Sequence, residues 1–244
     1  MSYHHWKQYF EGNQIHFGDI DWQAEDNLTA DEKKLIARSI QQFQRGENSE
    51  GKHLFAFAKT FDDPLYPECI RLFIREEQMH ARVLAKFMNR YFIPCIKEHW
   101  VDGVFRRLRK LTGIENSIMI LLIAEIISKV YYAALKKATG SALLQKICSQ
   151  VLKDEDQHIS FQCYTLQVLF RKRSSLSGAL IRTLYFILMT GTIAVVWLYH
   201  KPVLRKGGYT LPSFHRAVMA LYKTCEATIL NKRNFISDVE ILFP

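Results

Sequence analysis

Two short stretches of the chain repeat the same pair of potential metal ligands. "REEQMH" places Glu77 three residues before His80, and "KDEDQH" places Glu155 three residues before His158. On a helix, residues three apart project from nearly the same face, so each carboxylate would lie beside its imidazole. Two such helices facing each other would form a metal site. The alternative is a chance pairing on two solvent-exposed, charged helix faces.

A glutamate in a strongly apolar stretch favours the metal site. Glu125 is the only charge between Ile118 and Ser128, within "IMILLIAEIIS". An ionised carboxylate among Leu and Ile side chains is costly unless it is paired or binds a metal. Glu125 and Glu155 lie equally far before and after Gly140. Two helices that fold back at this glycine would bring the two glutamates level.

Two glutamates compete for the corresponding position in the first half of the chain. Glu50 and Glu77 lie nearly equally far from a predicted turn at Asp63, so Glu50 is the preferred ligand. Glu47 lies about one helical turn away on the same face and is the alternative.

Neighbouring polar residues are assigned less specific roles. Glu76, Asp154 and Asp156 are expected to face solvent, as charged helix residues usually do. Tyr131 and Tyr132 follow Glu125 by about two turns, and packing is their expected role, with redox chemistry as the alternative.

The elements that must position these residues are predicted to be helices. Glycine and proline are scarce, at 11 and 6 residues in 244, which disfavours a turn-rich β fold. Apolar periodicity and capping signals predict helices over about 29–61, 63–91, 114–139, 141–172, 176–199 and 212–231, with a short basic helix at 102–111. This order predicts an N-terminal arm (1–28), a bundle of two antiparallel helix pairs joined by one long crossover (29–172), and two additional C-terminal helices on the same domain (173–244).

The ligand pattern resembles a known superfamily over roughly residues 30 to 170. The set Glu50, Glu77-x-x-His80, Glu125, Glu155-x-x-His158 is similar to that of the ferritin-like di-iron carboxylate proteins. These include ferritins, ribonucleotide reductase small subunits, acyl-carrier desaturases, aldehyde-deformylating oxygenases and tRNA hydroxylases. The resemblance implies an all-α, ferritin-like four-helix bundle that binds two iron ions, or one manganese and one iron. His80 and His158 would each bind one metal, and either Glu77 with Glu155 or Glu50 with Glu125 would bridge them.

The resemblance implies an O2-dependent oxygenase or oxidase that acts on a small organic substrate, apolar or carrier-bound. No catalytic side chain beyond the metal ligands is predicted. Apolar residues on the four helices are expected to form the substrate pocket: Phe43, Leu54, Phe73, Leu84, Leu121, Leu122, Ile126 and Phe161.

The chain has a net charge of +9 and a pI of about 9.3. A basic surface suits an acidic electron donor or carrier protein, and it suits RNA equally well. A tRNA-modifying hydroxylase is therefore an alternative function, although no RNA-binding motif supports nucleic acid as the partner. Iron storage is a second alternative, and a non-enzymatic partner-binding bundle is a third. Paired bundles are common in the superfamily, so a homodimer is one expected assembly.

Cysteine usage and an apolar segment bear on location. The five cysteines are scattered without a C-x-x-C, which indicates a reducing compartment, and the N-terminus lacks the apolar run of a signal peptide. A cytoplasmic protein is expected. Thr183 to Tyr199 contains no charge and is slightly short for a membrane span. The first interpretation is a buried helix, the second is contact with a membrane surface, and the third is a span.

Overall fold

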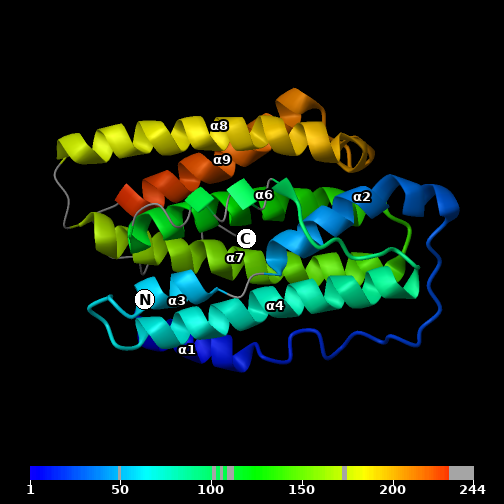
Figure 1. Ribbon diagram of the computed structural model, residues 1–244, viewed down its shortest axis with the longest axis horizontal. Coiled ribbons are helices and arrows are strands. Elements are labelled where there is room, and N and C mark those ends of the chain that lie inside the picture. The colour runs from blue at the N-terminus through cyan, green and yellow to red at the C-terminus, as the bar shows by residue number, and fades with distance from the viewer. Residues whose placement is uncertain (49–50, 101–102, 105–106, 109–112, 172–174, 231–244) are drawn as a thin grey trace.

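All regular secondary structure in the described part of the chain is helical, which confirms the all-α prediction (Figure 1). The computed structural model describes residues 1–48, 51–100, 103–104, 107–108, 113–171 and 175–230. Its helices are α1 (Tyr3–Gly12), α2 (Ala30–Glu47), α3 (Lys52–Ala58), α4 (Tyr66–Arg90), α6 (Ile114–Ala138), α7 (Ala142–Phe170), α8 (Ser175–Lys206) and α9 (Leu211–Leu230).

Two helix pairs carry the predicted ligands. α6 and α7 pack along each other on either side of a tight turn, where the Ser141 side chain accepts a hydrogen bond from the Leu144 amide and caps α7. α2 packs on α4, and α4 packs on α7. Thr29 and Glu32 form the predicted capping box at the start of α2. The Glu32 carboxylate also accepts a hydrogen bond from the Gly140 amide, which ties the start of α2 to the α6–α7 turn.

The predicted continuous helix over 29–61 is wrong, because the backbone breaks after Glu47. Asn48 ends α2 with non-helical dihedral angles, and Gly51 adopts a left-handed conformation with a φ of 63° before α3 begins. A side chain at Gly51 would also collide with Ile74 of α4. Two helices therefore replace the single one that the apolar periodicity predicted. Glu50 and Ser49 lie outside the described residues.

The N-terminal segment contains a helix that the sequence analysis missed. α1 begins at the cap residue Ser2 and packs on α4. Tyr3, Trp6 and Phe10 are almost fully buried, and this spacing places all three on one helical face. The segment is therefore part of the core rather than only an appended arm.

The two C-terminal helices pack on the helices that carry the ligands. α8 contacts α6 and α2, and α9 contacts α7 and α6. α8 is longer than predicted, since it continues past Tyr199 and through Pro202 to Lys206. The predicted short basic helix at 102–111 lies largely outside the described residues.

Gly207, the residue after α8, lies against the backbone of α6. A Cβ at this position would lie 2.5 Å from the Ala134 carbonyl oxygen, whereas a Cβ at Gly191, within α8, would meet nothing within 4 Å. We expect Gly207→Ala to lower the free energy of unfolding by about 1–3 kcal/mol through overpacking. The matched control Gly191→Ala should raise it by about 0.5–1 kcal/mol, because glycine disfavours a helix interior. Denaturant titration measures both, and equal stabilities would contradict the close approach.

Candidate metal centre

Four of the predicted ligands converge from α4, α6 and α7. The Nδ1 atom of His158 lies 3.1 Å from Oε1 of Glu77, 3.8 Å from Oε2 of Glu155 and 3.9 Å from Oε2 of Glu125. One ligand atom from each of these residues lies within 4.8 Å of the others. Three carboxylates therefore face one imidazole nitrogen in the middle of the helices.

A second group of four lies directly beside the first. Glu47, Glu77, His80 and Glu155 also offer ligand atoms within 4.8 Å of one another. The Nδ1 atom of His80 lies 3.5 Å from Oε1 of Glu77. The two groups share Glu77 and Glu155, so the side chains surround two adjacent positions rather than one.

The atoms that face these positions lack hydrogen-bond partners. Glu155, His80 and His158 are fully buried, and Glu77 is mostly buried. In the described structure, no hydrogen bond reaches Nδ1 of either histidine, Oε1 of Glu77 or either carboxylate oxygen of Glu155. Buried polar atoms are almost always hydrogen-bonded, so this cluster needs an additional partner. Two bound cations would give each of these unpaired atoms a partner.

Glu47, the predicted alternative to Glu50, lies at the cluster. It is the last residue of α2 and is buried, and its Oε1 accepts hydrogen bonds from the Tyr132 hydroxyl at 2.9 Å and from Ser128 at 3.4 Å. Glu50 falls outside the described residues, so Glu47 is the glutamate from this region that the structure places at the cluster. Tyr132 thus orients a carboxylate besides packing in the core.

The crowding of carboxylates shifts their pKa values. Burial raises the pKa of Glu47, and the negative charge of Glu77 raises it further. Burial and the neighbouring Glu125 raise the pKa of Glu155 in the same way. Burial also opposes ionisation of Glu125, but the adjacent Glu155 and His158 and the hydrogen bond from Gln162 hold its pKa low. Without a cation, the cluster therefore retains protons that isolated carboxylates would lose.

The histidine at the centre responds to the same charges. Burial opposes protonation of His158, but the nearby carboxylates of Glu125, Glu155, Glu76 and Glu77 raise its pKa well above the ordinary value. A bound cation would replace this proton, since a metal ligand must be the neutral imidazole.

The prediction that Glu76 and Asp154 face solvent is wrong, because both are buried. Nε2 of His158 on α7 lies 2.9 Å from Oε2 of Glu76 on α4, and Nε2 of His80 on α4 lies 3.0 Å from Oδ2 of Asp154 on α7. The acidic residue that directly precedes Glu77 or Glu155 therefore contacts the histidine of the opposite helix. This contact directs Nδ1 inward and favours the Nε2–H tautomer, which a histidine needs in order to bind a metal through Nδ1.

The sequence contains a signal for the two acids that contact the histidines, Glu76 and Asp154. Both motifs contain two consecutive acids before the histidine, Glu76-Glu77 and Asp154-Glu155. Asp156, by contrast, is only half-buried and forms an ion pair with Lys129.

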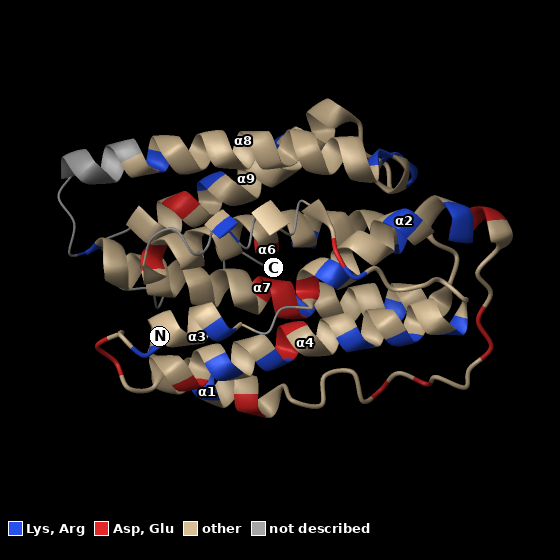
Figure 2. Cartoon of the chain, in the orientation of Figure 1, with Lys and Arg blue, Asp and Glu red and all other residues tan. Residues whose placement is uncertain are grey.

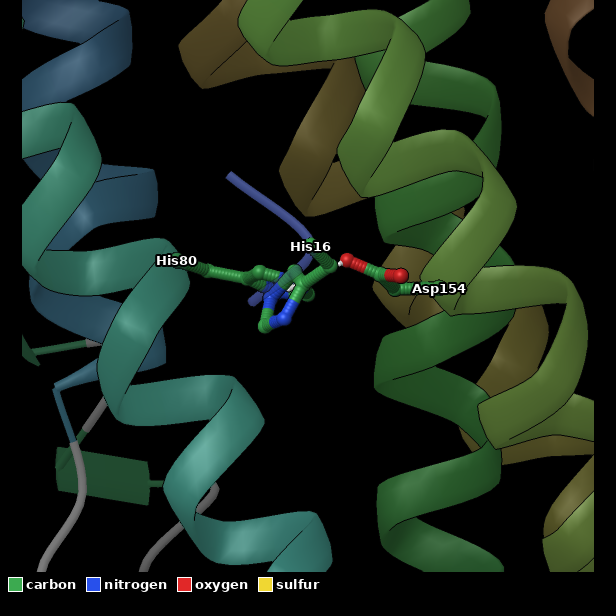
Figure 3. Close-up of side chains that lie close together, drawn as sticks. All are labelled: His16, His80 and Asp154. Atoms are coloured by element: carbon green, nitrogen blue, oxygen red, sulfur yellow. Dashed lines mark hydrogen bonds and ion pairs between the residues drawn. The ribbon is translucent and has the colours of Figure 1, made fainter. Parts of the chain in front are cut away.

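The segment after α1 closes the site, and the sequence analysis missed it. The Asn13 side-chain amide donates to Glu76 at 2.8 Å and to Asp154 at 3.0 Å, so one residue connects both acids. His16 and His80 converge on Asp154 from different elements, with Nε2 of His16 3.4 Å from the carboxylate (Figure 3). His16, His80 and Asp154 form a third group of potential ligands, although Asp154 already orients His80.

A cavity of about 190 Å³ adjoins the centre. The carboxylates of Glu47, Glu77 and Glu125 lie at its wall. Four residues of the predicted pocket line it, Phe43, Leu54, Phe73 and Leu121. The opposite wall comes from α8, through Thr192, Val195, Val196, Tyr199 and His200.

Four residues of the predicted pocket are absent from this cavity's lining, and they are Leu84, Leu122, Ile126 and Phe161. All four are buried in the core instead. Phe161 packs against Trp6 and Phe10 of α1, with ring centroids 5.5 and 5.3 Å apart. α1 thus fills the side of the helices where part of the pocket was expected.

The donor set could hold metal ions. Four carboxylates and two imidazoles combine hard oxygen with borderline nitrogen donors. No known protein-family model matches the chain, and no curated protein matches its sequence.

The raised pKa values lead to a prediction for the metal-free protein. Folded Glu47 and Glu155 keep protons above their ordinary pKa of 4.5, and folded His158 keeps one above 6.5. The folded state then binds more protons than the unfolded state, so stability falls as the pH rises. We expect the thermal midpoint of the chelator-treated protein to fall between about pH 5 and pH 9, and to fall less after iron loading.

The double variant Glu47→Gln/Glu155→Gln is the control for this pH dependence, because it keeps the side-chain shapes and removes two of the titrating groups. Its midpoint should vary less with pH than that of the wild type. A metal-free wild-type midpoint that rises over the same range would contradict the protonation of the cluster.

A second prediction concerns Asn13. Asn13→Ala removes the amide that connects Glu76 and Asp154, and outer-shell changes of this kind typically weaken metal binding about 10- to 100-fold. Competition with a chelator of known affinity measures the loss for Fe(II). Asn89→Ala, at an exposed position of α4, is the matched control. Equal affinities in both variants would show that the N-terminal segment plays no part in the site.

Proposed function

We propose that the cluster is a dinuclear metal centre in a ferritin-like four-helix bundle, and that it uses O2 to oxidise an organic substrate. The bundle would consist of α2, α4, α6 and α7, with the connection between α4 and α6 as its long crossover. The observation that carries the proposal is the pair of four-residue ligand groups that share Glu77 and Glu155. Nδ1 of both histidines, Oε1 of Glu77 and both carboxylate oxygens of Glu155 have no hydrogen-bond partner in the described structure.

The geometry supports one of the two bridging arrangements. Glu47 and His80 would bind one ion, Glu125 and His158 would bind the other, and the shared residues Glu77 and Glu155 would bridge them. The chain's contribution is to hold these side chains before an ion arrives. Gln162 donates to Glu125 at 3.0 Å, Tyr132 donates to Glu47, and the outer acids orient both histidines.

Two iron ions, or a manganese–iron pair, would supply the activation of O2 at this position. The surrounding residues would exclude water, because the cluster lies within a helical core of aliphatic and aromatic side chains.

The cavity supports an apolar substrate. The described lining residues include no Lys or Arg, and the glutamates in the wall are the proposed metal ligands. An apolar cavity of about 150 Å³ holds benzene, so about 190 Å³ accommodates a group slightly larger than benzene. Apart from the proposed ligands, the described lining of the cavity contains no acidic residue. Ferritins move iron through acidic channels, so this lining favours an organic substrate over iron storage.

Metal stoichiometry tests the centre. Wild-type protein loaded anaerobically with Fe(II) and desalted should contain two iron ions per chain by plasma mass spectrometry. Glu155→Gln removes a shared ligand and should lose both ions, whereas Glu125→Gln should mainly weaken one. Glu115→Gln, on α6 outside the cluster, should retain two. Unchanged iron in Glu155→Gln would overturn the proposed centre.

Oxygen uptake by the same samples tests the activity. Iron-loaded wild type and Glu115→Gln should consume O2 in an oxygen electrode. With Glu155→Gln, O2 uptake should be no faster than with the same concentration of free Fe(II). Two bound ions without O2 uptake would establish a metal-binding protein and overturn the oxidase.

A further inference from the structure

Two helices are long and apolar enough to cross a membrane, but they are placed very differently. In α6, 83% of the apolar window is buried, as expected for a core helix. In α8, the window lies within Ile181–Lys206 and only 28% of it is buried. Much of an apolar helix of this length therefore faces outward.

The outward face of α8 forms a continuous apolar strip, which we call the α8 strip. Leu184, Ile187 and Leu198 are 56%, 61% and 74% exposed, and the exposed small residues Gly191 and Ala194 lie between them. These spacings place all five residues along one side of the helix. Figure 2 shows α8 as a long outer helix with few charged residues along its length. Contiguous exposed apolar surface of this kind marks an interaction site.

Exposed cations lie at the C-terminal end of α8 and on the two helices that contact it. Lys201, Arg205 and Lys206 are exposed at the end of α8. Exposed cations also occur on the two helices that contact α8: Lys34 and Arg38 on α2, and Arg216 and Lys223 on α9. In the described parts of α8 and α9 the only acid is Glu226, which lies 3.7 Å from Arg182.

We propose that the α8 strip docks the protein on an anionic lipid surface, with α8 lying in the plane of the membrane. Apolar side chains would enter the interface, while the exposed Lys and Arg side chains contact the anionic headgroups. The inner face of α8 stays packed, since Met189, Ile193 and Trp197 are buried against the rest of the protein. A transmembrane orientation would expose these residues, so α8 lies on the membrane and does not cross it.

The charge distribution favours lipid over a second copy of the chain. A two-fold pairing through the α8 strip would place two cationic surfaces against each other, whereas an anionic surface neutralises them. The inference does not depend on the metal centre. The opposite side of the same helix, at Val196 and His200, lines the cavity, so a docked protein would hold its cavity close to the lipid.

Vesicle co-sedimentation with the full-length protein tests the proposal. We expect sedimentation with phosphatidylcholine vesicles that contain about 30% phosphatidylserine, and much less with pure phosphatidylcholine. Raising the NaCl concentration to about 0.5 M should release most of the bound protein, because salt screens the headgroup attraction.

A matched pair of substitutions locates the contact. Leu198→Glu should weaken binding about tenfold or more, because it places a carboxylate in the α8 strip. Phe92→Glu makes the same kind of change at a side chain that is 87% exposed after the end of α4, and it should bind like the wild type. Circular dichroism checks that both variants retain the helical fold.

Three results would overturn the proposal. The first is wild-type protein that stays in the supernatant with anionic vesicles at low salt. The second is equal binding by the wild type and Leu198→Glu. The third is a dimer that Leu198→Glu dissociates, seen by light scattering, in a protein that does not bind vesicles, because the α8 strip would then pair two copies.

Discussion

Four carboxyl groups and two imidazoles meet in the middle of an otherwise apolar helical core, and the rest of the structure has to compensate for that. Desolvation alone disfavours ionised carboxylates there, and their mutual repulsion adds to the cost. In the metal-free protein, protons on Glu47, Glu155 and His158 relieve part of the repulsion. The proposed pair of cations would replace these protons and link metal binding to folding stability.

The second layer of polar contacts makes the arrangement rigid. Each histidine is held by an acid from the opposite helix, so α4 and α7 position each other's ligands. Asn13 then connects the two acids, and the buried aromatic face of α1 fixes the segment that carries it. A segment distant in sequence thus completes the site without contributing a ligand to either four-residue group.

α8 contributes to two different surfaces. Its inner side closes the cavity beside the carboxylates, and its outer side presents the α8 strip. These roles need opposite faces of one helix, which explains why the helix is apolar all round rather than amphipathic. The proposed membrane contact and the proposed substrate cavity would then be separated by a single helix.

The sequence alone determined the features that depend on local spacing. Glu77 and His80 share a helical face because they are three residues apart, and the apolar surroundings of Glu125 already indicated an unusual buried charge. The position of Glu47 at the cluster and the backbone break between Glu47 and Gly51 are features that the apolar periodicity conceals. Contacts between distant segments determine the roles of Glu76, Asp154 and Asn13. They also determine which face of α8 packs inward and which faces outward. Only the tertiary structure could decide them, because burial and pairing are properties of the packed helices and not of any one helix.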